Sequence, residues 1–290
     1  MRSWHDVREL PSRPSHSPHR PADFLRVIGR LMRKHPLIAF FVLAYLLTWW
    51  IYPLLKFSPL LGIFGLFGPA IAAIIMAAVT DGKSGVTALL GRVVLWRVGL
   101  PWYVIALGLP TILSLATAAL AYLAGATEFI RVGALAPIEL VLFVLVVGEE
   151  LGWRGYALPR LLEKRSALTA SLILGVLWGL WHLPTFLVPG TPQYGLPLTA
   201  FVLLTIEYSI LMTWVFIHTL GSVLIATLFH GAINLSQGLF VGGIDGATRY
   251  WLLSIVYGVA AIIAAIALSR SALRKPVAAP RSEVRDSTTS

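Results

Sequence analysis

The residues best suited to chemistry lie in three short motifs in the second half of the chain. The motifs are Glu149-Glu150-x-x-x-Arg154, Trp178-x-x-x-His182 and His230-x-x-x-Asn234. Each motif falls within or at the end of an apolar segment long enough to cross a membrane. An ionisable group at that depth costs a few kcal/mol or more, so each one is a candidate functional group.

The first motif separates the roles of its two carboxylates. Arg154 follows Glu150 by four residues and therefore shares its helical face, which predicts an ion pair within the helix. Glu149 points about 100° away and can face another helix, as a general base or a metal ligand. A purely structural ion pair at the end of a span needs one Glu, so the presence of two favours a function.

The other two motifs supply imidazole and amide groups. Trp178 and His182 share one helical face, as do His230 and Asn234. A single buried His, or a single His and Asn pair, is often only structural. Taken together with Glu149, however, these groups can activate water.

Two chemistries fit these residue types, and the sequence leaves both open. In the first, Glu149, His182 and His230 bind Zn²⁺ and leave one coordination position for water. In the second, Glu149 and His182 deprotonate water directly, while His230 and Asn234 stabilise the oxyanion. The sequence has no His-Glu-x-x-His motif, so a conventional zinc-protease helix is absent.

The composition places these motifs in a membrane protein. Of the 290 residues, 57% are hydrophobic and 12% charged, and the mean hydropathy is +0.80. Soluble domains usually carry about 25% charged residues. A soluble enzyme, a disordered protein and a fibrous repeat are therefore excluded. The absence of Cys excludes disulfides, thiolate metal sites, lipidated cysteines and cysteine nucleophiles.

Apolar segments predict an all-α, polytopic fold with about eight transmembrane helices. The expected spans are 37–55, 59–79, 100–124, 137–158, 167–188, 196–217, 222–240 and 250–269. The first three contain no acid, base or His, so we expect spans four to seven to form the catalytic cavity.

The basic residues predict the orientation and the domain limits. With the N-terminus inside, nineteen Lys and Arg lie on the cytoplasmic side and three on the other. We therefore expect a multi-pass protein of the cell membrane with both termini in the cytoplasm. The net charge of +10 indicates contact with anionic lipid rather than nucleic acid. The predicted domains are a disordered basic tail (1–35), a transmembrane domain (36–270) and a disordered tail (271–290).

The ordered motifs resemble those of the CPBP family of intramembrane proteases, which includes the CAAX prenyl endopeptidases. The resemblance covers about 145–240, including the Thr219-Leu220-Gly221-Ser222 turn, and departs at Trp178, where the family usually has Phe. It implies an eight-helix bundle with a cavity open to the cytoplasm, in which Glu149 and His182 activate water. His230 and Asn234 would bind the oxyanion or a metal, while the supporting residues would be Glu150, Arg154 and Trp178.

The expected function is an intramembrane endopeptidase that cleaves a peptide or a membrane protein near the cytoplasmic face. Two alternatives were weighed: a proton-coupled transporter relaying through Glu149, Glu150 and Glu207, and a non-catalytic immunity or scaffold protein. No inverted repeat supports the transporter. Glu207, in the middle of span six, is left outside the catalytic set. Three roles stay open for it: a residue of the site, a partner of Arg154, or part of a local polar cluster with Tyr208 or Ser209.

Overall fold

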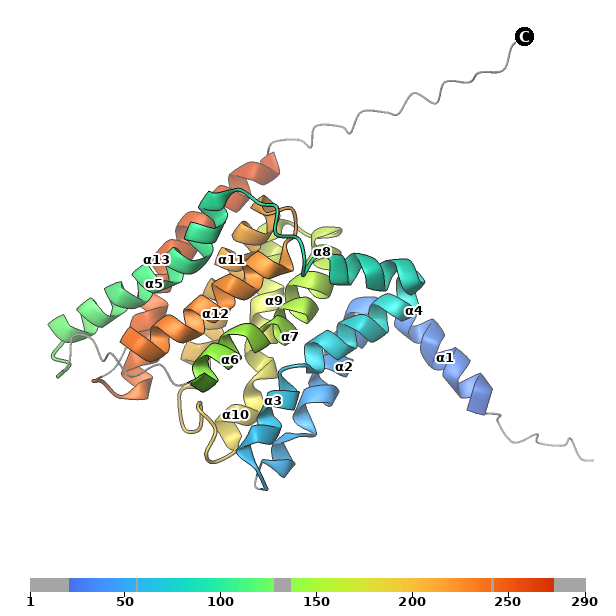
Figure 1. Ribbon diagram of the computed structural model, residues 1–290, viewed down its shortest axis with the longest axis horizontal. Helices are drawn as coiled ribbons and strands as arrows, with labels where there is room; N and C mark the ends of the chain where they lie inside the picture. The colour runs from blue at the N-terminus through green and yellow to red at the C-terminus, as the bar shows by residue number, and fades with distance from the viewer. Residues whose placement is uncertain (1–20, 56, 128–136, 241–242, 274–290) are drawn as a thin grey trace, which may run out of the picture.

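The computed structural model describes residues 21–55, 57–127, 137–240 and 243–273, and all regular secondary structure in these residues is helical (Figure 1). The α-helices are α1 (Pro21–Lys34), α2 (Pro36–Trp49), α3 (Gly62–Gly65), α4 (Gly68–Gly91), α5 (Leu100–Leu123), α6 (Pro137–Leu145), α7 (Val147–Glu150), α8 (Leu158–Leu162), α9 (Ala167–Trp181), α10 (Leu183–Leu187), α11 (Leu198–His218), α12 (Val223–Phe240) and α13 (Gly246–Leu273). Two short 3₁₀ turns, η1 (Tyr52–Leu54) and η2 (Pro59–Leu61), connect α2 to α3, and a π-helix, η3 (Leu151–Ala157), joins α7 to α8.

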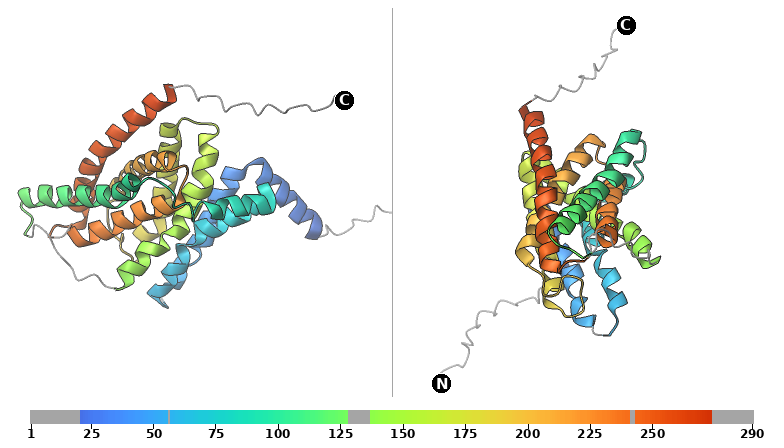
Figure 2. Two further views of the ribbon diagram at one scale, coloured as in Figure 1. Left: turned by 45° about the horizontal axis from the view of Figure 1, so that its top comes forward. Right: turned by 90° about the vertical axis from the view of Figure 1, so that its left-hand side faces the viewer.

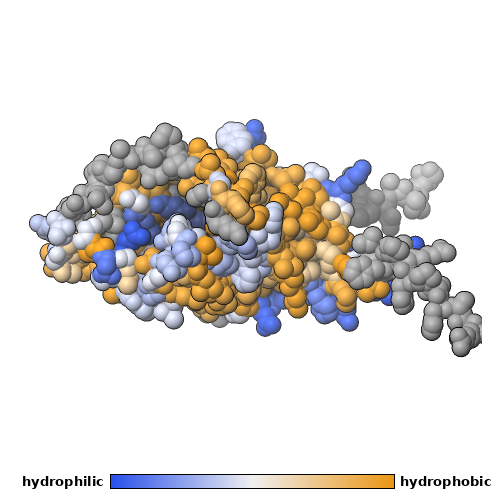
Figure 3. Space-filling model, turned by 90° about the horizontal axis from the view of Figure 1, so that it is seen from below, coloured by the Kyte–Doolittle hydropathy of each residue, from blue (hydrophilic) through white to orange (hydrophobic). Residues whose placement is uncertain are grey.

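Six helical segments in the described residues are long and apolar enough to cross a membrane, which confirms an all-α, multi-pass membrane protein. They are Pro36–Leu54, Gly62–Gly91, Leu100–Leu123, Leu198–His218, Val223–Phe240 and Gly246–Arg270, and they correspond to predicted spans one to three and six to eight. Apolar side chains also cover much of the surface in Figure 3.

Predicted spans four and five, which carry two of the three motifs, are shorter or broken. Span four is the run α6, α7, η3 and α8, and span five is the 15-residue α9 followed by α10. Irregular backbone at membrane depth is tolerated where protein surrounds it. That condition holds here, since every residue of η3 is buried.

Two sequence predictions about the tails need correction. The tail 1–35 is not disordered throughout, because Pro21–Lys34 form α1, an amphipathic helix; residues 1–20 lie outside the described part. Between predicted spans two and three the chain is partly helical, since α4 continues to Gly91 after a break at Gly82, where φ is 67° and ψ is −153°. That backbone conformation is accessible to Gly and strained for other residues. Of the predicted C-terminal tail, 271–273 belong to α13 and 274–290 lie outside the described residues.

The segment with the two glutamates and the π-helix that follows it lie at the centre of the helix packing. Helix α7, which carries both glutamates, contacts α4 and α12, and η3 contacts α2, α4, α8, α9 and α12. Helix α11 packs against α9 and α13, and α12 packs against α5. Figure 2 shows the same arrangement from two further sides, with α5, α12 and α13 together and α2 and α4 beside them.

Closely spaced glycines fix two of these helix crossings. A Cβ added to Gly148 would lie 2.7 Å from the Leu66 carbonyl oxygen, and one added to Gly152 would lie 2.5 Å from Pro69 Cβ. On α9, added Cβ atoms at Gly175 and Gly179 would lie 2.5 Å from backbone or side-chain atoms of α11. Small residues four apart let helices approach closely in membranes. Each glycine pair flanks or adjoins a motif residue, so the close crossings set where the motif side chains point.

The turn between α11 and α12 positions the third motif. Leu220 and Gly221 both have positive φ, of 57° and 82°, so the chain reverses within a few residues. The Ser222 hydroxyl donates to the Leu95 carbonyl oxygen at 2.7 Å and also accepts from the Ile225 backbone N–H at 3.2 Å. These bonds anchor the start of α12 and hence the position of His230, two turns further on.

Candidate active site

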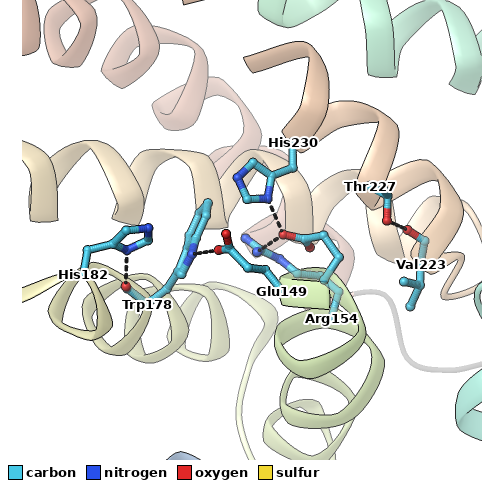
Figure 4. A network of polar contacts seen from close by, with 8 residues as sticks. Glu149, Arg154, Trp178, His182, Val223, Thr227 and His230 are labelled. Carbon is cyan, nitrogen blue, oxygen red and sulfur yellow. Dashed lines mark hydrogen bonds and ion pairs between the residues drawn. The ribbon is translucent and has the colours of Figure 1, made fainter. Parts of the chain in front are cut away.

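The motif side chains from three helices meet beside the centre of the bundle (Figure 4). Glu149 lies on α7, Trp178 on α9 and His230 on α12, while His182 is the residue that ends α9. The indole Nε1–H of Trp178 donates to Glu149 Oε2 at 2.9 Å. Both side chains are almost fully buried, with 3% of Glu149 and 2% of Trp178 exposed. One carboxylate oxygen is therefore held, and the other, Oε1, remains for chemistry.

The predicted ion pair within the first motif is present and extends to a second helix. Arg154 Nη1 donates to Glu150 Oε1 at 2.9 Å, and both side chains are fully buried. His230 Nδ1 lies 2.8 Å from the same carboxylate oxygen. An ionised carboxylate only accepts hydrogen bonds, so Nδ1 of His230 carries the hydrogen. Glu150 thus orients His230 as well as pairing with Arg154.

The second histidine is oriented in the same sense by the backbone. His182 Nδ1 lies 3.0 Å from the Trp178 carbonyl oxygen, an atom that also only accepts. In both imidazoles Nδ1–H therefore donates a hydrogen bond that orients the ring, and Nε2 is free to interact with water or substrate. This arrangement is common for histidines that bind a metal or take part in catalysis.

The motif side chains border a cavity of about 1090 Å³. Glu149, Trp178, His182, His230 and Asn234 all line it, and Asn234 is exposed to it one turn beyond His230. Glu150 and Arg154 are not among its lining residues. The site thus has a row of side chains that face the cavity and a buried pair behind them.

The cavity also takes residues from outside predicted spans four to seven. Tyr52, Leu60 and Ile63 come from the connection between α2 and α4, and Tyr250 comes from α13. The segment between α2 and α4 has mainly apolar side chains, so its sequence contains no signal that it borders the site. The cavity is thus lined by the polar motif residues together with many apolar side chains.

The cavity wall also has polar residues that were not predicted for the site, among them Tyr208 and Gln237. The Gln237 side-chain amide donates to the Tyr208 hydroxyl oxygen. Gln237 follows Asn234 by three residues on α12, so helical spacing could have identified it. Tyr208 was considered only as a neighbour of Glu207 in a local polar cluster.

Glu207 itself lies elsewhere, and its predicted pairing with Arg154 is wrong. Its Oε1 accepts a hydrogen bond of 2.7 Å from the Ser254 hydroxyl, so it lies between α11 and α13. Arg154 instead stacks over Trp178, with its guanidinium carbon 4.6 Å from the ring centroid.

The residue types at this site suit Zn²⁺, but their arrangement does not supply a metal centre as it stands. Within the described ranges, no group of three His, Asp or Glu side chains lies in an arrangement that could hold a metal ion. Oε2 of Glu149 is also engaged by Trp178. A Zn²⁺ site formed by Glu149, His182 and His230 stays a prediction.

Comparison with known proteins gives the same assignment for this part of the chain. Residues 131–236 match the family model described as Type II CAAX prenyl endopeptidase Rce1-like. This segment is Rce1-like. It contains all three motifs, so the resemblance inferred from them is confirmed here. The CAAX prenyl protease 2 of Methanococcus maripaludis is 35% identical over 109 residues, which are 36% of this chain and 40% of that relative. The matched part of the chain thus spans well under two thirds of that relative's length.

Proposed function

We propose that the chain is an intramembrane endopeptidase that hydrolyses a peptide bond with water activated by Glu149. The observation that carries this proposal is the shared cavity: Glu149, His182, His230 and Asn234 all face it, and each histidine has its Nδ1 engaged behind it. The Rce1-like match of the same segment supports the same chemistry.

In the proposed mechanism, Glu149 and His182 act on the water. Glu149 Oε1 takes one proton from the water while the water oxygen attacks the scissile carbonyl carbon. The other O–H of the water donates a hydrogen bond to His182 Nε2. His182 can accept because its hydrogen is on Nδ1, held by the Trp178 carbonyl. The hydrogen bond from Trp178 keeps the Glu149 carboxylate facing the cavity.

The other two residues stabilise the oxyanion that forms on the substrate. The Asn234 amide supplies one donor, and His230, held by the Glu150 carboxylate, supplies the second through Nε2–H when its ring carries both hydrogens. When the carbon–nitrogen bond breaks, Glu149 returns its proton to the leaving amine. The second proton of the attacking water remains on the new carboxylic acid and passes from there, through His182 Nε2, to the amine. The products are a carboxylate and an ammonium group, and Glu149 is ready for another water.

The location and substrate follow from the charge distribution and from the relative. The excess of Lys and Arg supports a cell-membrane protein with both termini in the cytoplasm. In that orientation the connections 52–63 and 188–193, which line the cavity, lie on the opposite side of the membrane, which differs from the cytoplasmic opening that the sequence predicts. The substrate is proposed to be a peptide or membrane protein. Because the similar archaeal protein is called a CAAX prenyl protease, a prenylated CAAX peptide is the first substrate to test.

The two alternatives are not favoured. A proton relay through Glu207 lacks continuity, because Glu207 bonds to Ser254 between α11 and α13 rather than facing the cavity. A non-catalytic scaffold has no need for two histidines with their Nε2 atoms directed to one cavity.

The test is cleavage by the purified protein in detergent or liposomes, with Glu149→Gln as the inactive variant. Glu207→Gln is a matched control, since it also removes a buried intramembrane carboxylate but lies outside the cavity. We expect loss of cleavage for the first and near-normal cleavage for the second. Cleavage that survives Glu149→Gln would refute the mechanism. A parallel reaction with a zinc chelator addresses the metal: loss restored by Zn²⁺ would favour the Glu149, His182 and His230 metal site over direct activation.

A further inference from the structure

Helix α1 has two unlike faces. At about 100° per residue, Arg26, Arg30 and Arg33 fall within roughly 60° of one another around the helix axis, and Lys34 lies beside them. Val27, Ile28 and Leu31 occupy the opposite side, over roughly 100°. The helix contains one acidic residue, Asp23, against these four cations. It is thus basic on one side and aliphatic on the other.

The aliphatic side is largely uncovered by protein. The exposed fractions are 54% for Val27, 36% for Ile28 and 55% for Leu31. Among the residues of α1 whose burial is described, Met32 is the apolar one that packs against the core, and α1 contacts α2 and α4. Figures 1 and 2 show α1 projecting away from the bundle beside α2 and α4.

The covalent connection to the first span sets the level at which α1 lies. His35 has a non-helical backbone, with φ of −130° and ψ of 63°, and Pro36 begins both α2 and the membrane-crossing segment. A residue before Pro is disfavoured in the helical conformation, so α1 does not continue into α2 as one straight helix. Because α1 ends two residues before the span starts, its C-terminal end is held next to the end of that span.

We propose that α1 is an interfacial helix that binds anionic phospholipid. Val27, Ile28 and Leu31 enter the outer acyl region, and the basic face contacts the lipid phosphates. Two features favour a lipid surface over a protein partner: its level is fixed by the adjacent span, and its charge is almost wholly of one sign. Amphipathic helices with basic polar faces bind in this way. The proposal does not depend on the proposed protease activity.

The full-length protein offers a clean test because it has no Cys. Two single-cysteine variants, Leu31→Cys on the aliphatic face and Arg30→Cys on the basic face, are labelled with an environment-sensitive fluorophore. Each is reconstituted into vesicles of phosphatidylcholine alone or mixed with phosphatidylglycerol. In mixed vesicles we expect the label at residue 31 to be blue-shifted and quenched most by nitroxides near the headgroup end of the acyl chain. The label at residue 30 should remain accessible to aqueous iodide.

The charge contribution is tested in the Leu31→Cys background. Removing two cations with Arg26→Gln and Arg33→Gln should lower the ratio of docked to undocked helix about fivefold per charge in mixed vesicles. Lys164→Gln and Arg165→Gln remove the same charge from exposed positions outside α1, and should leave that ratio unchanged.

Three results would overturn the proposal. The label at residue 31 could be as accessible to iodide in mixed vesicles as the label at residue 30. Its protection could be the same with and without phosphatidylglycerol. Its protection could rise with the protein-to-lipid ratio, which would show that a second copy of the chain covers the face.

Discussion

The hydrogen bond between Trp178 and Glu149 can be removed with little other change. Trp178→Phe deletes the indole N–H, which donates to Glu149 Oε2 at 2.9 Å, but keeps an aromatic ring. The ring matters separately, because it stacks against Arg154 and meets the edge of His230, with ring centroids 5.1 Å apart in the second contact. The substitution therefore tests the orientation of the proposed base.

The magnitude follows from the charge and burial of the two groups. A hydrogen bond to a charged group contributes about 1.5–3 kcal/mol, and 1.36 kcal/mol corresponds to a tenfold change in rate. Because Glu149 also borders the cavity, a water can replace part of the lost bond. We therefore expect kcat to fall by about tenfold to a hundredfold, nearer the lower value, with little change in KM.

The assay is steady-state peptide cleavage by purified Trp178→Phe and a matched variant, Trp181→Phe. Trp181 is also 2% exposed and lines the same cavity, but its indole nitrogen has no hydrogen-bond partner among the described residues. Removing that N–H should cost little activity. If both variants lose the same activity, or neither does, the bond does not orient Glu149 and the reasoning is refuted.

Three further substitutions test other parts of the site. Asn234→Ala should lower kcat by about a hundredfold or more in the cleavage assay with folding intact, because an oxyanion donor is lost; an unchanged kcat would exclude that role. Arg154→Ala should reduce folded yield as well as activity, by about 3–5 kcal/mol of stability, since it strands the buried Glu150; normal yield on size-exclusion chromatography would contradict this. Gly152→Ala should lower thermal stability by about 1–3 kcal/mol, because its Cβ would meet α4 at 2.5 Å, whereas Gly108→Ala, with nothing within 4 Å, should not. Equal melting temperatures for these two variants would show that the close crossing is unimportant.

Much of the site was predictable because helical spacing is local. The pairing of Glu150 with Arg154 and the divergence of Glu149 from that pair follow from residue spacing on one helix. The other site residues were predicted because ionisable side chains are rare in apolar membrane spans, which makes each one a candidate functional group. These signals were sufficient to identify the Rce1-like segment before any helix packing was known.

The contacts between helices were not predictable in the same way. The bond from His230 to Glu150 depends on how α12 crosses α7, and the bond from Trp178 to Glu149 depends on how α9 is placed. Close approaches accompany both placements: α9 meets α11 at Gly175, and α12 meets Phe143 of α6 at Gly231. Glycines four apart were visible in the sequence, but they do not reveal which helix they face.

The interruptions of the helices were also hidden. Hydropathy over 137–158 indicates one span, whereas the structure divides it at α6, α7 and η3. Hydropathy indicates that a segment lies in the membrane but does not show where its backbone hydrogen bonding is interrupted.

The amphipathic helix α1 was not predicted, because residues 1–35 were treated as one segment and the residues before α1 are polar and rich in proline.

The central claim is proteolysis with water activated by Glu149, and comparative peptidomics of membranes tests it most directly. Host membranes containing the wild-type protein are compared with those containing Glu149→Gln or Glu207→Gln at equal expression. The account predicts that the same cleavage fragments appear with the wild type and with Glu207→Gln and are missing with Glu149→Gln. Identical peptide profiles from all three membranes would contradict it.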